Sequence, residues 1–359
     1  MDADPLSEGT REAATLVRYP QDMDSHDKPA ETHACESATA APFFIVGSGR
    51  SGSTLLRMML VSHSRLTIPP ETWYLVPLVR RFSVDRPLNA QEIEGAVSII
   101  TSHYRWPDMK LDTLDFRRKV AQLREPYLRD LVEVVYWFHV DAEGKARWGD
   151  KTPLYVEILP ELATMFPDSR FIHLVRDGRD VAKSYQATDW IGPWLHDNTR
   201  EWNRALECHW RWARSDLRTR ILQVRYEDLV LETETTLRHI CRFIGENFEP
   251  QMLSWEQKVD EQVPTRERDV HAKLKLKVGA EGVARWKREM NARETFVAEA
   301  FMGAHLRRLG YQARYPSSLW APAFMLTRLY CRTVLPAVEF HLRAARFLRK
   351  RLGFRSGLG

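Results

Sequence analysis

Cysteine is scarce in this chain, which has only four among its 359 residues. They lie far apart, and their spacing fits neither a disulfide framework nor a zinc site. This scarcity excludes a small disulfide-stapled secreted protein and favours a reducing compartment. The four are Cys35, Cys208, Cys241 and Cys331.

Long apolar runs are also lacking. The first residues are acidic, and no apolar segment precedes a small-residue cleavage site, so no secretory signal is visible. The most apolar C-terminal stretch, residues 320–338, is broken by Pro322, Arg328, Arg332 and Pro336, which makes it a poor membrane span. We therefore expect a soluble cytoplasmic protein, or one that lies peripherally at the inner face of a membrane.

A broad basic surface is missing as well, although the net charge is +5. Residues 1–41 carry a net charge of −6 and residues 318–359 one of +7, which leaves only +4 for the body between them. This distribution argues against a nucleic-acid-binding protein. It predicts three parts: a disordered acidic leader (1–41), one P-loop α/β domain (42–317) and a basic amphipathic helical tail (318–359).

Short apolar segments alternate with helical patterns in the body, and this alternation predicts a parallel sheet with right-handed crossovers. Residues 71–142 are mostly helical in pattern. The predicted fold class is α/β, with a P-loop-type parallel sheet flanked by helices, a helical insertion and a helical C-terminal extension. Strands are expected at residues 43–46, 66–68, 171–175 and 221–224, and helices at 154–165, from about 180, at 233–243 and at 295–309.

A glycine-rich loop follows the first expected strand. Gly47 and Gly52 are spaced as in the pattern G-x-x-x-x-G-K-[ST], but Ser53 occupies the position of the lysine that binds triphosphates. The positive charge lies inside the loop instead, at Arg50. The loop therefore predicts a smaller anion, such as a phosphosulfate, that needs no bridging metal ion. Its side-chain ligands would be Arg50 and the hydroxyls of Ser51, Ser53 and Thr54.

A second polar turn follows the expected strand at residues 171–175. Arg176 and, one or two helical turns later, Ser184 can clamp a second phosphate at the carboxyl edge of the sheet. The alternative is a solvated turn in which Arg176 and Arg179 pair with the neighbouring acids Asp177 and Asp180.

Residues 42–56, PFFIVGSGRSGSTLL, resemble the phosphosulfate-binding loop of sulfotransferases that use 3′-phosphoadenosine 5′-phosphosulfate (PAPS). The resemblance is closest to the bacterial and tyrosylprotein-type group and continues in the family's order over residues 42–312. It implies PAPS as co-substrate, no metal ion, and a 3′-phosphate site at Arg176 and Ser184. The other implied donor ligands are Gly49, Arg50, Ser51, Gly52, Ser53, Thr54, Tyr226, Lys277 and Gly279.

Two of these assignments are less direct. Tyr226 lies in the segment VRYEDL, which also fits a strand end followed by a capped helix. Lys277 and Gly279 lie in a segment that is similar to the family's late loop but has two extra residues before Trp286.

The resemblance also implies three catalytic residues, Glu71, Lys151 and Arg50. Glu71 matches a catalytic glutamate and can serve as general base if burial raises its pKa; alternatively it is an acid at the start of a helix over residues 72–79. Lys151, in WGDKTP, would neutralise the leaving oxygen; alternatively it is a solvated lysine in a turn. His173, expected in the core, and His63, expected in a turn, do not displace Glu71.

The acceptor is predicted only as a hydroxyl of a glycan, a lipid or a small metabolite. Aromatic residues of the insertion are expected to wall its pocket: Trp73, Tyr74, Tyr104, Trp106, Tyr136 and Trp137. The other functions considered are a P-loop kinase or NTPase and a non-enzymatic membrane-associated scaffold. The tail 318–359 is expected to lie on an anionic membrane, to pack on the body or to form a homodimer contact.

Overall fold

A computed structural model describes residues 41–188, 191, 194–264, 279–316 and 318–334. Within these residues, five strands form one sheet in the order β2-β3-β1-β4-β5, and every strand pair is parallel. This arrangement confirms the predicted α/β fold with a P-loop-type parallel sheet. The strands are β1 (Phe43–Gly47), β2 (Leu66–Thr67), β3 (Arg147–Lys151), β4 (Arg170–Val175) and β5 (Ile221–Arg225).

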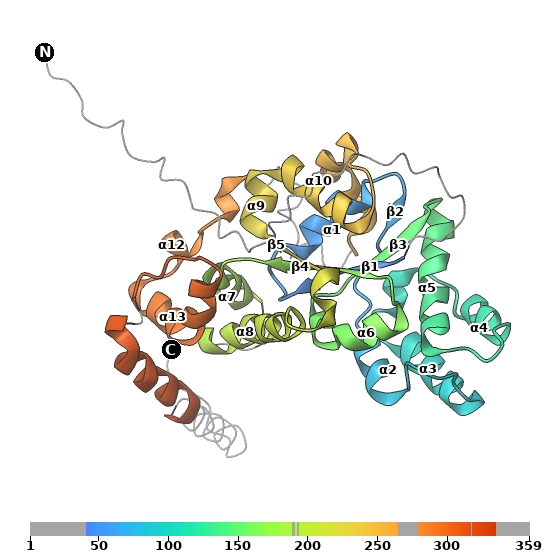
Figure 1. The fold of residues 1–359 in the computed structure, drawn as a ribbon, viewed down its shortest axis with the longest axis horizontal. Coiled ribbons are helices and arrows are strands. Elements are labelled where there is room, and N and C mark those ends of the chain that lie inside the picture. The colour runs from blue at the N-terminus through green and yellow to red at the C-terminus, as the bar shows by residue number, and fades with distance from the viewer. Residues whose placement is uncertain (1–40, 189–190, 192–193, 265–278, 317, 335–359) are drawn as a thin grey trace, which may run out of the picture.

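Helices cover both faces of the sheet (Figure 1). One face carries α1 (Ser53–Val61), α9 (Tyr226–Leu231) and α10 (Thr233–Ile244); the other carries α5 (Leu128–Glu143), α6 (Leu159–Met165) and α8 (Leu195–Trp212). Alternate side chains of β1 enter the two layers, because successive residues of a strand point to opposite faces. Phe43 and Ile45 pack in the cluster that contains α1 and α10. Phe44 and Val46 pack in the cluster that contains α5 and α6.

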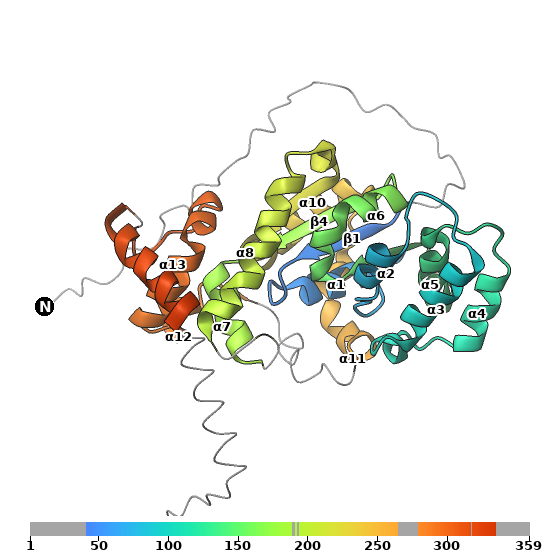
Figure 2. The same cartoon turned by 90° about the horizontal axis from the view of Figure 1, so that it is seen from below.

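The two ends of the sheet carry different helical groups (Figures 1 and 2). The predicted insertion at residues 71–142 is confirmed as a helical region at one end. At the opposite end, α7 (Gly178–Gln186) and α8 share an apolar cluster with the late helices. The insertion contains α2 (Leu75–Arg81), α3 (Ala90–Ser102) and α4 (Thr113–Ala121) besides α5; α11 is Val259–Gln262, α12 is Trp286–Glu289 and α13 is Ala292–Arg308.

The structure departs from the sequence prediction at β3, which was not expected. This strand has the polar sequence Arg-Trp-Gly-Asp-Lys, yet all five residues are buried. Its polar groups find distant partners: the guanidinium of Arg147 donates to the carbonyl oxygens of Ala41 and Ile244, each at 2.7 Å. The helix expected at 154–165 is also divided, into a 3₁₀ segment (Pro153–Ile158) and α6.

The leader and part of the tail fall outside the described residues. Nothing structural is assigned to residues 1–40 or 335–359, so their predicted disorder and amphipathic character remain predictions. Residues 318–334 form a helix, as expected for the start of the tail. Among the described residues, no helix is both long enough and apolar enough to cross a membrane.

Candidate active site

A cavity of about 1250 Å³ opens at the carboxyl ends of β1 and β4. Ligands of parallel α/β sheets bind at this edge. Ten of the residues predicted to bind the donor or to act in catalysis line the cavity: Gly49, Arg50, Gly52, Ser53, Thr54, Glu71, Arg176, Ser184, Tyr226 and Gly279. The chain thus brings segments more than 200 residues apart into one site.

The glycine loop has a shape that depends on its glycines. Gly47 and Gly52 have φ angles of 146° and 96°, a region that other residues rarely adopt. A Cβ atom on Gly52 would lie 2.4 Å from the Tyr226 ring, and one on Gly49 would lie 2.2 Å from the Tyr185 hydroxyl. The loop therefore lies directly against two aromatic side chains. It leads into the N-terminus of α1, where backbone N–H groups favour an anion.

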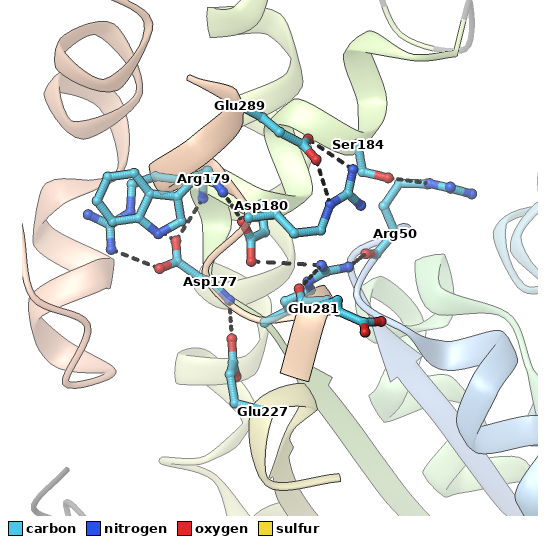
Figure 3. Close-up of polar contacts among 12 residues, drawn as sticks. Arg50, Asp177, Arg179, Asp180, Ser184, Glu227, Glu281 and Glu289 are labelled. Atoms are coloured by element: carbon cyan, nitrogen blue, oxygen red, sulfur yellow. Dashed lines mark hydrogen bonds and ion pairs between the residues drawn. The ribbon is translucent and has the colours of Figure 1, made fainter. Parts of the chain in front are cut away.

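Two arginines that follow different strands line the cavity, and Figure 3 shows one of them, Arg50, beside Ser184. Arg50 follows β1, and its Nε donates a hydrogen bond to Ser184 Oγ at 3.0 Å. Arg176 follows β4 and donates to the carbonyl oxygens of Arg50, at 3.3 Å, and Gly282, at 2.6 Å. Its guanidinium also lies 4.3 Å from the centre of the Tyr226 ring. Two cationic groups in one cavity suit a ligand with two anionic groups.

The loop hydroxyls have different roles. Ser53 and Thr54 begin α1 and line the cavity. Ser51 is 1 % exposed and does not line it; its Oγ lies 2.6 Å from Ser48 Oγ. The Ser51 side chain therefore stabilises the loop from inside, which corrects its predicted role as a side-chain ligand.

Arg179 has a structural role. Its guanidinium forms a bidentate ion pair with Asp177 and donates a hydrogen bond to Glu299 at 2.6 Å. It also lies 3.7 Å from the ring centre of Trp286. These contacts tie the turn after β4 to α12 and α13. Figure 3 shows the pair of Arg179 with Asp177.

The alternative for the turn after β4 is right about the pairing and wrong about the solvent. Arg179 pairs with Asp177, and Arg176 lies 3.7 Å from Asp180. The two arginines are only 6 % and 2 % exposed, for Arg176 and Arg179 respectively.

The late loop supplies one wall of the cavity. Gly279 and Gly282 line it, and Gly282 lies directly against Tyr226, the first residue of α9. Tyr226 therefore both starts a helix and faces the cavity, so its two sequence interpretations are compatible. Lys277 lies outside the described residues. Gly282 is the second glycine of this loop and was given no role of its own from the sequence; its carbonyl oxygen accepts a hydrogen bond from Arg176.

Glu71 lines the cavity and forms an ion pair with Lys151, which lies behind it and does not itself line the cavity. The carboxyl ends of β2 and β3 bring them together, because these strands are parallel neighbours. Lys151 Nζ lies 2.5 Å from Glu71 Oε1 and 3.2 Å from Thr54 Oγ1. Lys151 is 2 % exposed, so the solvated-lysine alternative is wrong. The helix-start alternative for Glu71 is also wrong, because α2 begins only at Leu75.

Three donors surround the Glu71 carboxylate. Besides Lys151, the indole Nε1 of Trp73 donates to Oε2 at 2.6 Å, and Arg105 lies 3.6 Å from the same oxygen. Burial by itself would raise the pKa of Glu71, but the charges of Lys151 and Arg105 and the two hydrogen bonds outweigh it, and the pKa falls below its ordinary value of 4.5. The sequence prediction had required the opposite direction for a general base.

Asp150 supports this pair, although sequence reasoning assigned it no role. It accepts hydrogen bonds from Thr72 Oγ1 and Tyr136 Oη, each at 2.8 Å. The backbone N–H of Thr72 also donates to Thr152 Oγ1 at 3.2 Å. Burial raises the pKa of Asp150 to about 6. The segment around Asp150 therefore holds the residue next to Glu71 in place.

The cavity contains fewer of the expected aromatic residues than the sequence predicted. Of the six expected, only Trp73 and Tyr104 line the cavity. The others pack into the core; Tyr136, for example, stacks on Trp148 with ring centres 4.0 Å apart. Successive aromatic residues of a helix or turn point in different directions, so they cannot share one wall. The cavity lining also includes Arg105, Leu154, Val156 and Ala205, which were not predicted from the sequence.

Neither predicted histidine lines the cavity. His173 lies in β4, is 1 % exposed, and stacks on His209 with ring centres 4.2 Å apart. Burial holds the pKa of His173 well below its ordinary value. Among the described residues neither of its ring nitrogens has a hydrogen-bond partner, so it is a core residue but not a satisfied one. His63 lies in the turn after α1, as predicted, and its Nε2 lies 2.8 Å from the Asn247 carbonyl oxygen.

The fold and the site define a glycine-loop α/β protein whose cavity is suited to a doubly anionic ligand. A family model described as the sulfotransferase family matches residues 42–250, and the chain belongs to this family. The sulfotransferase domain of the Synechococcus PCC 7002 olefin synthase has the same fold, with a TM-score of 0.53 and 24% identity over 70% of this chain and 88% of that chain.

Two curated relatives share part of the sequence. Nodulation protein NoeE of Sinorhizobium fredii is 29% identical over 156 residues, 43% of this chain and 33% of its own. Protein-tyrosine sulfotransferase 2 of Gallus gallus is 26% identical over 219 residues, 60% of this chain and 53% of its own. The chain thus spans between a third and about half of the length of these relatives.

Proposed function

We propose that this protein transfers a sulfuryl group from PAPS to a hydroxyl group of an acceptor. The observation that carries the proposal is the convergence of Arg50 and Arg176 on one cavity beside the glycine loop. The loop N–H groups, Ser53 and Thr54 are assigned to the 5′-phosphosulfate, and Arg176 with Ser184 to the 3′-phosphate. This second anion site favours PAPS over a nucleoside triphosphate, for which the lysine is missing at Ser53.

The other end of the cavity carries the groups that the reaction needs. PAPS supplies an activated sulfuryl group, whose transfer breaks one sulfur–oxygen bond and forms another to the acceptor oxygen. Glu71 takes the proton that the acceptor hydroxyl loses. Lys151 stabilises the negative charge left on the phosphate, and Arg50 adds to this stabilisation from the loop.

Lys151 connects these two steps. Its ammonium group contacts both the Glu71 carboxylate and Thr54 at the start of α1, so it lies between Glu71 and the glycine loop. When its charge is shared with the leaving phosphate, it stabilises the Glu71 carboxylate less. Burial then raises the pKa of Glu71 and makes it a better proton acceptor. This coupling supports Glu71 as general base despite its lowered pKa.

The acceptor end suits a hydroxyl carried by a partly apolar molecule. Trp73, Tyr104, Leu154 and Val156 offer aromatic and aliphatic surface, and Arg105 adds one charge close to Glu71. A glycan, a lipid or a small metabolite with such a surface fits this lining. The class of the acceptor is therefore a target for screening with labelled donor.

Calorimetry with 3′-phosphoadenosine 5′-phosphate (PAP), followed by transfer of ³⁵S from labelled PAPS, tests the proposal. We expect PAP to bind more tightly than ATP with Mg²⁺. Arg176→Ala should weaken PAP binding at least about tenfold, since a hydrogen bond to a charged group contributes about 1.5–3 kcal/mol. Arg117→Ala, which removes an exposed ion pair on α4, is the matched control. Tight binding of ATP–Mg²⁺ without binding of PAP would assign the cavity to an NTPase and overturn the proposal.

A further inference from the structure

The helix at residues 318–334 carries an exposed apolar face. Among the large hydrophobic side chains that are exposed in the described residues, seven of eleven lie in this helix. Six of them form its outward face, with exposed fractions between 42% and 77%: Leu319, Met325, Leu326, Leu329, Tyr330 and Val334. So dense a patch on a folded protein marks an interaction surface.

The opposite face of the helix fixes it to the body. Phe324 and Cys331, seven residues apart, are 2 % and 4 % exposed. The ring of Phe324 lies 4.9 Å from that of Phe296 in α13, and Trp320 lies 5.5 Å from the same ring. The helix extends away from the sheet beyond α13 (Figure 1). Its apolar face is therefore turned away from the protein core by the packing of the other side.

Charge identifies what covers this face. Arg328 and Arg332 are exposed, stand one helical turn apart and flank the apolar stripe, and residues 318–334 contain no acidic residue. Residues 318–359 together carry a net charge of +7. Pairing with the same face of a second copy would bring these like charges together, whereas an anionic lipid surface complements them.

We propose that the helix at residues 318–334 docks the protein onto an anionic membrane surface. Its leucines and Tyr330 enter the boundary between headgroups and acyl chains, and Arg328 and Arg332 contact anionic headgroups. The helix lies in the plane of the interface. The membrane contact of the tail then lies in its first half, on the exposed apolar face of this helix. This contact does not depend on the transferase activity proposed above.

Co-sedimentation of the full chain with vesicles tests this proposal without donor or acceptor. We expect binding to vesicles of phosphatidylcholine and phosphatidylglycerol in equal parts, and little binding to phosphatidylcholine alone. The double variant Leu326→Ser/Leu329→Ser should bind at least about tenfold more weakly. Arg328→Gln/Arg332→Gln should lower the affinity about 30-fold at low salt, since each basic residue near such a surface contributes about 1 kcal/mol.

The matched control is Leu114→Ser/Leu231→Ser, which removes two leucines that are 66% and 57% exposed on other helices. It should bind vesicles as the parent chain does, and all variants should unfold at the parent's temperature. Unchanged binding of Leu326→Ser/Leu329→Ser, with binding abolished by salt alone, would overturn the proposal in favour of simple attraction by the basic tail. A dimer of the parent chain that this variant converts to monomer without vesicles would also overturn it and assign the face to a second copy.

Discussion

The two ends of the cavity are built in different ways. The donor end is centred on one continuous loop, residues 47–54, whose form depends on glycines packed against Tyr185 and Tyr226. The acceptor end combines Glu71, Trp73 and Arg105 with Lys151, about 80 residues away in the chain. A local backbone structure thus faces a group of charges that only the sheet brings together. A change at the first should disturb binding, and a change at the second should disturb catalysis.

The largest effect is expected at the acceptor end. Glu71→Gln keeps the size of the side chain but cannot take a proton, so the rate of ³⁵S transfer should fall about 10³-fold, within the usual range for a general base. The affinity for PAP should stay within about twofold, because Glu71 contacts the glycine loop through Lys151, which this change leaves in place. Loss of PAP binding together with activity would show that the two ends are not separable.

Lys151→Ala should have the next largest effect, about a 10²-fold fall in the transfer rate, because one charge on the leaving group is lost. The pH profile gives a second readout. Without Lys151, burial of Glu71 has less to oppose it, so the pKa of Glu71 rises. The ionised base is then lost at a higher pH, and the acidic limb of kcat/KM should move upward. If the acidic limb did not move, Lys151 would not control the pKa of the general base.

At the donor end, Gly52→Ala should act through the backbone. The φ angle of 96° and the Tyr226 ring 2.4 Å from the added Cβ make alanine unfavourable by about 1–3 kcal/mol. Urea denaturation should show this loss, and PAP should bind roughly tenfold more weakly. Gly303→Ala is the control: Gly303 lies inside α13 with open space around its Cβ position, so alanine should be neutral or slightly stabilising there. If Gly52→Ala and Gly303→Ala changed stability and PAP affinity equally, the glycine loop would not depend on the absence of a side chain at Gly52.

Trp73→Phe should have the smallest effect of the four. It keeps an aromatic ring at the cavity but removes the indole N–H that donates to Glu71. One hydrogen bond to a charged group contributes about 1.5 kcal/mol, so the transfer rate should fall about tenfold with little change in PAP affinity. A larger change in the acceptor KM than in kcat would instead make Trp73 a binding residue for the acceptor.

The donor end could be predicted from the sequence because its parts are close together in the chain. The strand, the spacing of Gly47 and Gly52, and Arg50 all fall within a dozen residues. Short-range patterns of this kind fix a backbone shape and a binding property together. The four strands expected from apolar runs were also found. Burial on both faces explains the nearly continuous hydrophobic sequences of β1 and β4.

The acceptor end could be predicted only in part. The resemblance pointed to Glu71 and Lys151, but the strand that holds Lys151 was missed because its buried polar groups are satisfied by distant residues. The aromatic wall was overestimated for the same reason: composition gives the number of aromatic residues in the insertion, and packing decides which of them face the cavity.

The sequence by itself determined the glycine loop, the replacement of the usual lysine by Ser53, and the uneven distribution of charge along the chain. Each is a local property, and no distant residue changes it. Tertiary structure alone decided that Lys151 lies 2.5 Å from Glu71, that their pairing lowers the pKa of the carboxyl, and that the helix at residues 318–334 exposes its leucines. These properties depend on distances between residues far apart in the chain, which the parallel sheet and the packing of its helices establish.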